Sequence, residues 1–129
     1  MHLHGHDFAV LAQVQGQEYN PRNVTLNTQN PPRRDVVMLP QAGYVVIAFK
    51  ADNPGPWLMH CHIAKHASFG LSLQIMEDRE KANALWKKGD SAAIDNAAAL
   101  CNKWDDWYSN CTNHWNGTCD KWFQDDSGI

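Results

Sequence analysis

Six of the seven histidines in this chain lie in two short clusters. One cluster is His60-Cys61-His62, with His66 following closely, so that a thiol stands between two imidazoles. Alternate side chains of a strand point to opposite faces. If the triplet lies at the end of a strand, His60 and His62 share one face and Cys61 lies on the other. One tripeptide then serves two metal centres and gives an electron a short bonded route between them.

The Cys61 side has the donors of a blue-copper centre. A thiolate and two imidazoles in a trigonal array, with a weak or missing axial ligand, bind copper in such centres. His66 is placed to supply one imidazole through a short turn, and Leu71 occupies the position from which an axial ligand would approach. Because a leucine side chain cannot coordinate, we expect a fairly high reduction potential.

The N-terminal segment HLHGH supplies the opposite face. His2 and His4 alternate, so they share a face of an extended segment and can meet His60 and His62. Two such pairs can hold a cluster of more than one copper. We interpret His6 as a packing or supporting residue, because imidazole ligands need hydrogen-bonded neighbours.

Zinc is the main chemical alternative, since Cys and His also bind zinc. Structural zinc often uses paired Cys-x-x-Cys spacings, which this sequence lacks. Copper is therefore favoured. A free buried cysteine and surface histidines without a metal remain the simplest alternative.

At these residues the chain resembles the multicopper oxidases. HCHIAKHASFGL resembles their C-terminal copper signature, HLHGH resembles the other half of their third-domain site, and the final DSGI resembles the processed end of asco-type fungal laccases. The roles that this resemblance implies are type 2 copper ligand for His2, type 3 ligands for His4, His60 and His62, type 1 ligands for Cys61 and His66, non-coordinating axial position for Leu71, and channel plug for Ile129.

The resemblance also implies an activity. Phenols or aromatic amines would lose single electrons at the His66 edge, and dioxygen would be reduced to water, as in lignin degradation. A complete enzyme would hold four coppers, with the remaining ligands in preceding cupredoxin domains. We therefore expect a C-terminal fragment, inactive alone, in which Met1 is an internal residue. The alternatives are a small blue-copper electron-transfer protein, a ferroxidase or ascorbate oxidase, and a secreted binding domain with vestigial histidines.

Length and composition argue against a nucleic-acid-binding protein and a membrane-spanning protein. With 129 residues and a net charge of -3, the chain fits one domain at most and lacks the basic character of nucleic-acid-binding proteins. No apolar run is long enough to suggest a membrane span. Three glycosylation sequons favour a secreted protein. They begin at Asn23, Asn110 and Asn116.

Three cysteines remain as disulfide candidates once Cys61 is assigned to copper. Cys111 and Cys119 are close enough in sequence to close a small loop, whereas the resemblance implies that Cys101 bonds a preceding domain. Free thiols in a reducing compartment are the alternative.

The pattern of apolar residues and turns predicts a mainly β fold. We expect a partial cupredoxin-like Greek-key sandwich or barrel over residues 1–76, with an open side to its core, and a helical and irregular tail over 77–129. Tryptophans of the tail are expected to clamp it onto the barrel. The predicted strands are 7–15, 35–39, 44–51, 57–63 and 70–76, with a further short one at 24–26. The predicted helices are a single turn at 63–68 and longer ones at 78–88 and 92–104.

Overall fold

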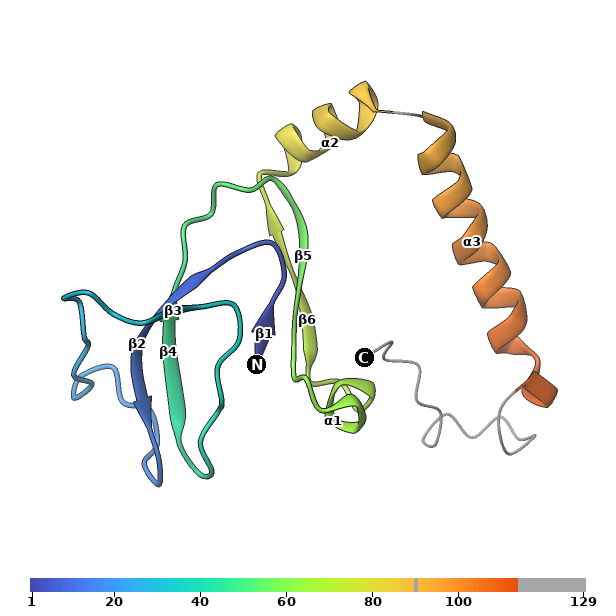
Figure 1. The fold of residues 1–129 in the computed structure, drawn as a ribbon. Helices are drawn as coiled ribbons and strands as arrows, with labels where there is room; N and C mark the ends of the chain where they lie inside the picture. Colours follow the sequence, from blue (N-terminus) through green and yellow to red (C-terminus); the bar gives the residue numbers. More distant parts are fainter. Residues whose placement is uncertain (90, 114–129) are drawn as a thin grey trace.

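The computed structural model describes residues 1–89 and 91–113. They form two three-stranded antiparallel sheets followed by two long helices (Figure 1). The first sheet has the order β1 (His2–Leu3), β5 (Gly55–His60), β6 (Ser72–Glu77), and the second has the order β3 (Arg33–Arg34), β2 (Phe8–Val14), β4 (Tyr44–Ala48). The mainly β architecture predicted from the sequence is confirmed.

Side chains from both sheets form the core. Leu3 and Phe8 are each 1% exposed, and Val37 packs with them. Burying a side chain of this size contributes about 1.5–3 kcal/mol. Half-buried residues of β2, β4, β5 and β6 surround this centre. Other large apolar side chains, including Met38 and Leu73, are exposed, which agrees with the expected open side of the core.

The predicted strand over residues 35–39 is wrong. Arg33–Arg34 pair with β2 in the second sheet, but Val36 forms an isolated bridge with His2 in the first. The Val37 amide also donates to the Met1 carbonyl at 2.9 Å. Because the chain crosses from one sheet to the other here, its pairing partner changes and no continuous strand forms.

Three other strand predictions need correction. Residues 24–26 are not a strand, and this polar segment is tied instead by Asn27 donating to the Leu11 carbonyl, 2.8 Å away, at the irregularity in β2. β4 ends at Ala48 and is half-buried, because the charged pair of Lys50 and Asp52 follows it in solvent. β5 begins two residues before the predicted start, at Gly55, and ends at His60, so Cys61 and His62 lie beyond the strand on which they were expected.

The helices follow the last strand, except for the single turn of α1 (Ala64–Ser68). α2 (Arg79–Lys88) begins after Asp78, whose carboxylate accepts from the Lys81 amide at 3.1 Å, and ends at Gly89 as predicted. α3 (Ser91–Ser109) is longer than predicted and leads into the 3-10 turn η1 (Cys111–Asn113).

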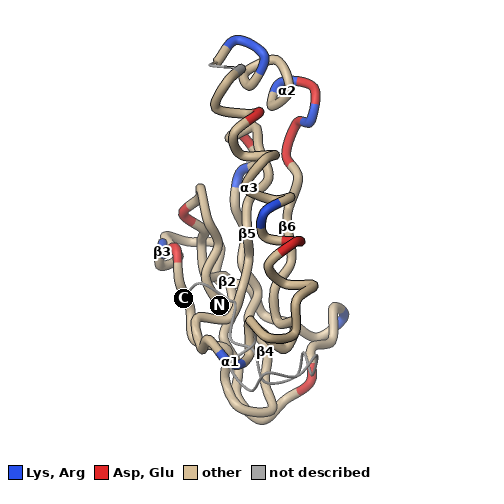
Figure 2. The backbone as a smooth tube through the Cα atoms, turned by 90° about the vertical axis from the view of Figure 1, so that its right-hand side faces the viewer, with Lys and Arg blue, Asp and Glu red and all other residues tan. Residues whose placement is uncertain are grey.

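Of the tail rings expected to clamp it onto the barrel, Trp115 and Trp122 lie outside the described residues, so the clamp stays a prediction, and the described rings of α3 contact one another. Trp104 stacks on Trp107 and Tyr108, with ring centroids 5.1 and 5.5 Å apart, because residues three and four positions apart share a helix face. Figure 1 shows α3 standing apart from both sheets. A view turned by 90° shows charged residues gathered on the helices and nearly absent from β4 and β5 (Figure 2). No helix in the part of the chain that the structure describes is long and apolar enough to cross a membrane.

Candidate metal centre

Strand pairing brings the two histidine clusters together. β1 runs antiparallel to β5 with His2 opposite His60 and Leu3 opposite Met59, so the segment HLH lies against Leu58–His60 and its imidazoles come close to that of His60. The donor atoms of His2, His4 and His60 all lie within 4.8 Å of one another. His4 Nε2 and His60 Nε2 are 3.1 Å apart. Two nitrogens bound to one metal at about 2.0–2.1 Å would lie about 3 Å apart, so this spacing fits a shared ion.

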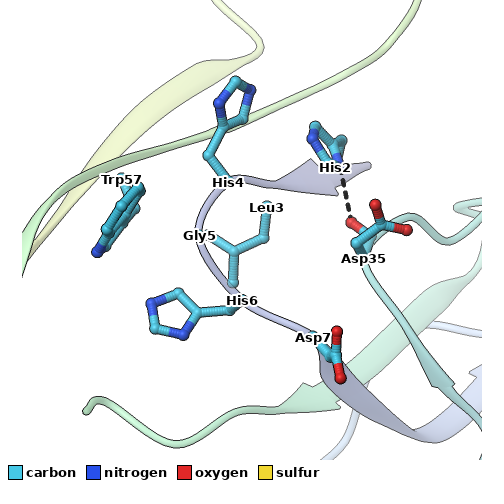
Figure 3. A pocket seen from close by; sticks show the side chains of 8 residues that line it. All are labelled: His2, Leu3, His4, Gly5, His6, Asp7, Asp35 and Trp57. Carbon is cyan, nitrogen blue, oxygen red and sulfur yellow. Dashed lines mark hydrogen bonds between the residues drawn. The ribbon is translucent and has the colours of Figure 1, made fainter. Parts of the chain in front are cut away.

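Backbone carbonyls orient two of these rings. His2 Nδ1 lies 2.8 Å from the Asp35 carbonyl, drawn as a dashed line in Figure 3. His60 Nδ1 lies 3.0 Å from the carbonyl of Cys61. A carbonyl can only accept, so each Nδ1 carries the proton and each Nε2 keeps a lone pair. Such hydrogen bonds fix the tautomer that binds a metal.

The electrostatics of the cluster also favour a neutral His4 ring. Partial desolvation, together with the neighbouring His2, His60 and His62, lowers the pKa of His4 below its usual value, although His4 is an exposed residue. A histidine must be deprotonated to bind a metal. The His4 ring is therefore in its binding form at neutral pH.

His62 lies beside this group rather than within it. Its ring centroid is 5.6 Å from that of His60 and 5.9 Å from that of His2. His62 is exposed, whereas His60 is 2% exposed. The structure thus brings three of the four predicted cluster histidines into one donor group and places the fourth next to it.

Cys61 and His66 meet on the other side of the tripeptide. The Cys61 Sγ lies 3.6 Å from His66 Nδ1. The Cys61 amide donates to the Leu71 carbonyl, and the Leu71 amide donates to the His66 carbonyl, both at 3.0 Å. A sulfur and a nitrogen bound to one metal lie about 3.5 Å apart, so these two side chains fit a shared ion. Because β5 ends at His60, Cys61 and His62 follow the strand rather than alternate along it, yet the thiol of Cys61 still lies outside the donor group of His2, His4 and His60.

An apolar hollow of about 360 Å³ opens beside Cys61 and His66. Cys61 is 9% exposed, whereas His66, which also lines the hollow, is an exposed residue. The hollow is therefore suited to an aromatic ring rather than to a charged ligand. Its other lining residues are Met1, Val36, Val37, Met38, Leu39, Pro40, His62, Ile63 and Leu71.

His6 does not join the cluster. Its Nε2 lies 2.6 Å from Glu77 Oε1, with both side chains about 5% exposed or less, and Figure 3 shows its ring directed away from His2 and His4. The interpretation of His6 as a packing or supporting residue agrees with this geometry. Sequence reasoning gave Glu77 no role and assigned Asn53 only to a turn. Nothing local in the sequence indicates that Asn53 bonds to Gly5, 48 positions away.

The remaining predicted sites are the glycosylation positions, the disulfide cysteines and the C-terminal plug. Asn23 and Asn110 are exposed, Cys111 is disulfide-bonded, and Cys61 and Cys101 carry free thiols. The predicted bond of Cys101 to a preceding domain stays a prediction. Three further predicted residues lie outside the described part of the chain, namely Asn116, Cys119 and Ile129.

Comparisons with known proteins agree on one family. A multicopper oxidase family profile matches residues 1–81. The chain is 50% identical to a laccase of Arthroderma benhamiae over 129 residues, which are 100% of this chain and 20% of that protein. It is 57% identical to Laccase-2 of Botryotinia fuckeliana over 82 residues, which are 61% of this chain and 14% of that protein. The crystal structure of a laccase from Botrytis aclada matches with a TM-score of 0.69 and 40% identity, over 99% of this chain and 21% of the laccase.

Proposed function

This chain belongs to the multicopper oxidase family, and we propose that it forms the C-terminal copper-binding part of a laccase-type oxidase. The chain spans about 20% of the length of the laccase relative that it matches in full, so the other domains of such an enzyme would supply the remaining ligands. The observation that carries the proposal is the tripeptide geometry. Cys61 Sγ lies against His66, while His60 converges with His2 and His4 in a separate donor group.

The proposed copper ligands follow from these two groups. Cys61 and His66 would hold a type 1 copper, and Leu71, which lines the same hollow, has no atom that could coordinate it. His2 would hold a type 2 copper, and type 3 coppers would take His4, His60 and His62. When bound, the coppers supply one-electron redox chemistry, in which four electrons taken singly from a phenol or aromatic amine reduce dioxygen to water.

The chain's own residues would perform three tasks in this reaction. The apolar hollow would bind the aromatic ring of the donor beside the exposed His66 edge. The peptide bonds on either side of Cys61 would provide a short route to His60 and His62. The carbonyls of Asp35 and Cys61 would hold the ligand imidazoles in one tautomer.

Several finer properties belong to the same proposal. Residues 1–76 would form the cupredoxin-like domain, and 77–129 would form a tail that ends in a plug at Ile129. The sequons at Asn23 and Asn110 fall on exposed positions, which supports a secreted glycoprotein. The disulfide-bonded Cys111 also favours an oxidising compartment. Phenols released from lignin are one substrate class that the hollow would admit.

Metal analysis of the complete protein separates the alternatives. Four coppers per chain, a blue colour and oxygen uptake with a phenol support the laccase-type oxidase. One copper without oxygen uptake would indicate an electron carrier, which leaves the convergence of His2, His4 and His60 unexplained. Absence of copper would indicate vestigial histidines. A ferroxidase or an ascorbate oxidase would oxidise ferrous iron or ascorbate in preference to phenols.

Replacement of His66 tests the entry point for electrons. His66→Ala should abolish phenol oxidation, because it removes both a copper ligand and the exposed edge beside the hollow. His114→Ala, which removes the one histidine outside both sequence clusters, is the matched control and should retain activity. Phenol oxidation at the wild-type rate by the His66→Ala enzyme would contradict the assigned role.

A further inference from the structure

We propose that Asn53 is a positioning residue for the copper cluster, acting through the loop that carries His4. This inference rests on the proposed function and names a part of the site that no ligand motif contains. The loop joins β1 to β2 and places Gly5 between His4 and His6. Gly5 of this loop and three residues from outside it, Asn53, Trp57 and Glu77, are together called the loop clamp.

Asn53 is the centre of the loop clamp because it bonds to its three other members. Its side-chain Nδ2 donates to the Gly5 carbonyl at 3.0 Å. Its own carbonyl accepts from Trp57 Nε1 at 2.6 Å. Its amide donates to Glu77 Oε2 at 3.3 Å. One residue thus ties the loop to the strands β5 and β6.

The indole of Trp57 covers the loop where it turns. Gly5 has a φ of +74°, and a Cβ built on it would lie 2.4 Å from ring carbons of Trp57. Figure 3 shows the indole of Trp57 beside Gly5, the residue that links His4 to His6. The loop can therefore follow this path only with a glycine at this position and with the indole held in place.

Glu77 anchors the next residue of the same loop. Its Oε1 lies 2.6 Å from His6 Nε2 in a buried ion-pair contact, and neither atom has a hydrogen-bond partner among the described residues. On the other side, the His4 amide donates to the Leu58 carbonyl at 2.9 Å. His4 is therefore fixed by bonds on both sides of it in the chain. This double attachment holds His4 Nε2 at 3.1 Å from His60 Nε2.

The loop clamp does not touch the Cys61 side of the site. The hollow at Cys61 and His66 is lined by residues of other segments, and none of the four clamp residues is among them. Loss of the Asn53 bond should therefore weaken the histidine cluster and leave the thiolate copper in place. Residues that support metal ligands typically change metal affinity 10–100-fold when mutated.

The test uses the complete oxidase with Asn53→Asp. This change keeps the size of the side chain but replaces the donor to the Gly5 carbonyl with a carboxylate. Asn20→Asp makes the same chemical change in an exposed turn, where Asn20 Oδ1 only accepts from the Arg22 amide, so it is the matched control. Trp57→Phe is the second variant, because it keeps a ring over Gly5 and removes the bond to Asn53.

The readout is copper content during titration with a chelator, together with the optical and paramagnetic signals of each copper type. We expect Asn53→Asp to lose cluster copper at about 10–100-fold lower chelator concentration while its blue absorption persists. Trp57→Phe should show a smaller shift in the same direction, and Asn20→Asp should match the wild type. If Asn53→Asp keeps cluster copper as tightly as the wild type, or loses the blue copper equally, the positioning role is refuted. A wild-type protein without cluster copper would instead refute the proposed function.

Discussion

Gly5→Ala is the most stringent test of how the first histidine loop is built. At a φ of +74° an alanine is strained by about 1–2 kcal/mol, because the left-handed region crowds its Cβ. The added carbon would also lie 2.4 Å from Trp57 ring carbons, whereas carbon atoms pack at about 3.5–4.0 Å. The indole must therefore move by about 1 Å, away from its bond to the Asn53 carbonyl. Overpacking of this kind costs about 1–3 kcal/mol.

Gly16→Ala separates the two effects. Gly16 has a nearly identical φ of +69°, but a Cβ there would meet nothing within 4 Å. Only the backbone strain then applies, so Gly16→Ala should cost about 1–2 kcal/mol and Gly5→Ala about 2–5 kcal/mol. Thermal unfolding followed by tryptophan circular dichroism measures the difference, and copper content shows whether the cluster is affected. Equal destabilisation of the two variants, with equal copper content, would refute the close contact between Gly5 and Trp57.

Three other changes test separate parts of the chain. Cys61→Ser should remove the blue absorption of the complete oxidase and leave the cluster copper, since a hydroxyl replaces the thiolate, and spectra with metal analysis check this. Asp78→Ala should lower the thermal midpoint because it removes the cap of α2 and places alanine at a φ of +36°, whereas Asp78→Asn keeps an acceptor and should lower it much less. The hydrogen bond from the Lys81 side chain, and next the bond from its amide, lower the pKa of Asp78, so the contribution of both should be complete above about pH 3.9 and lost as the pH falls below that value through the folded pKa. Asn110→Gln should remove one glycan, seen as a smaller mass change on enzymatic deglycosylation of the secreted protein.

The sequence predicts well what depends on local spacing. The residue types of the triplet predict two separate donor groups, although β5 ends at His60 and the expected alternation does not continue through Cys61. The good helix formers among residues 78–88 predict α2 almost to the residue. The sequence predicts poorly those features that depend on a residue far away in the chain. The strand expected over 35–39 fails because Val36 pairs with β1 instead of with the sheet that holds β3. A β-branched run indicates extended backbone but contains no information about which edge it will meet.

The same limit explains why the loop clamp was not predicted. Asn53 precedes Pro54 and Gly55, a composition that any surface turn shares. Its side-chain bond crosses to Gly5 only because β5 and β1 pair in one register, with His2 opposite His60. A shift of one residue would turn His60 to the other face. The histidine motifs therefore identify the ligands, whereas the register decides which supporting residues reach them.

The length of β1 makes the histidine cluster depend on its neighbours. β1 has two residues and lies at the edge of its sheet, so few backbone hydrogen bonds hold it, each worth about 0.5–1.5 kcal/mol. It is retained by bonds on both sides, from Val37 to Met1 and from His4 to Leu58. A copper shared by His4 and His60 would join the same two segments, since one follows β1 and the other ends β5. Metal binding and the docking of β1 are then one equilibrium, in which each stabilises the other.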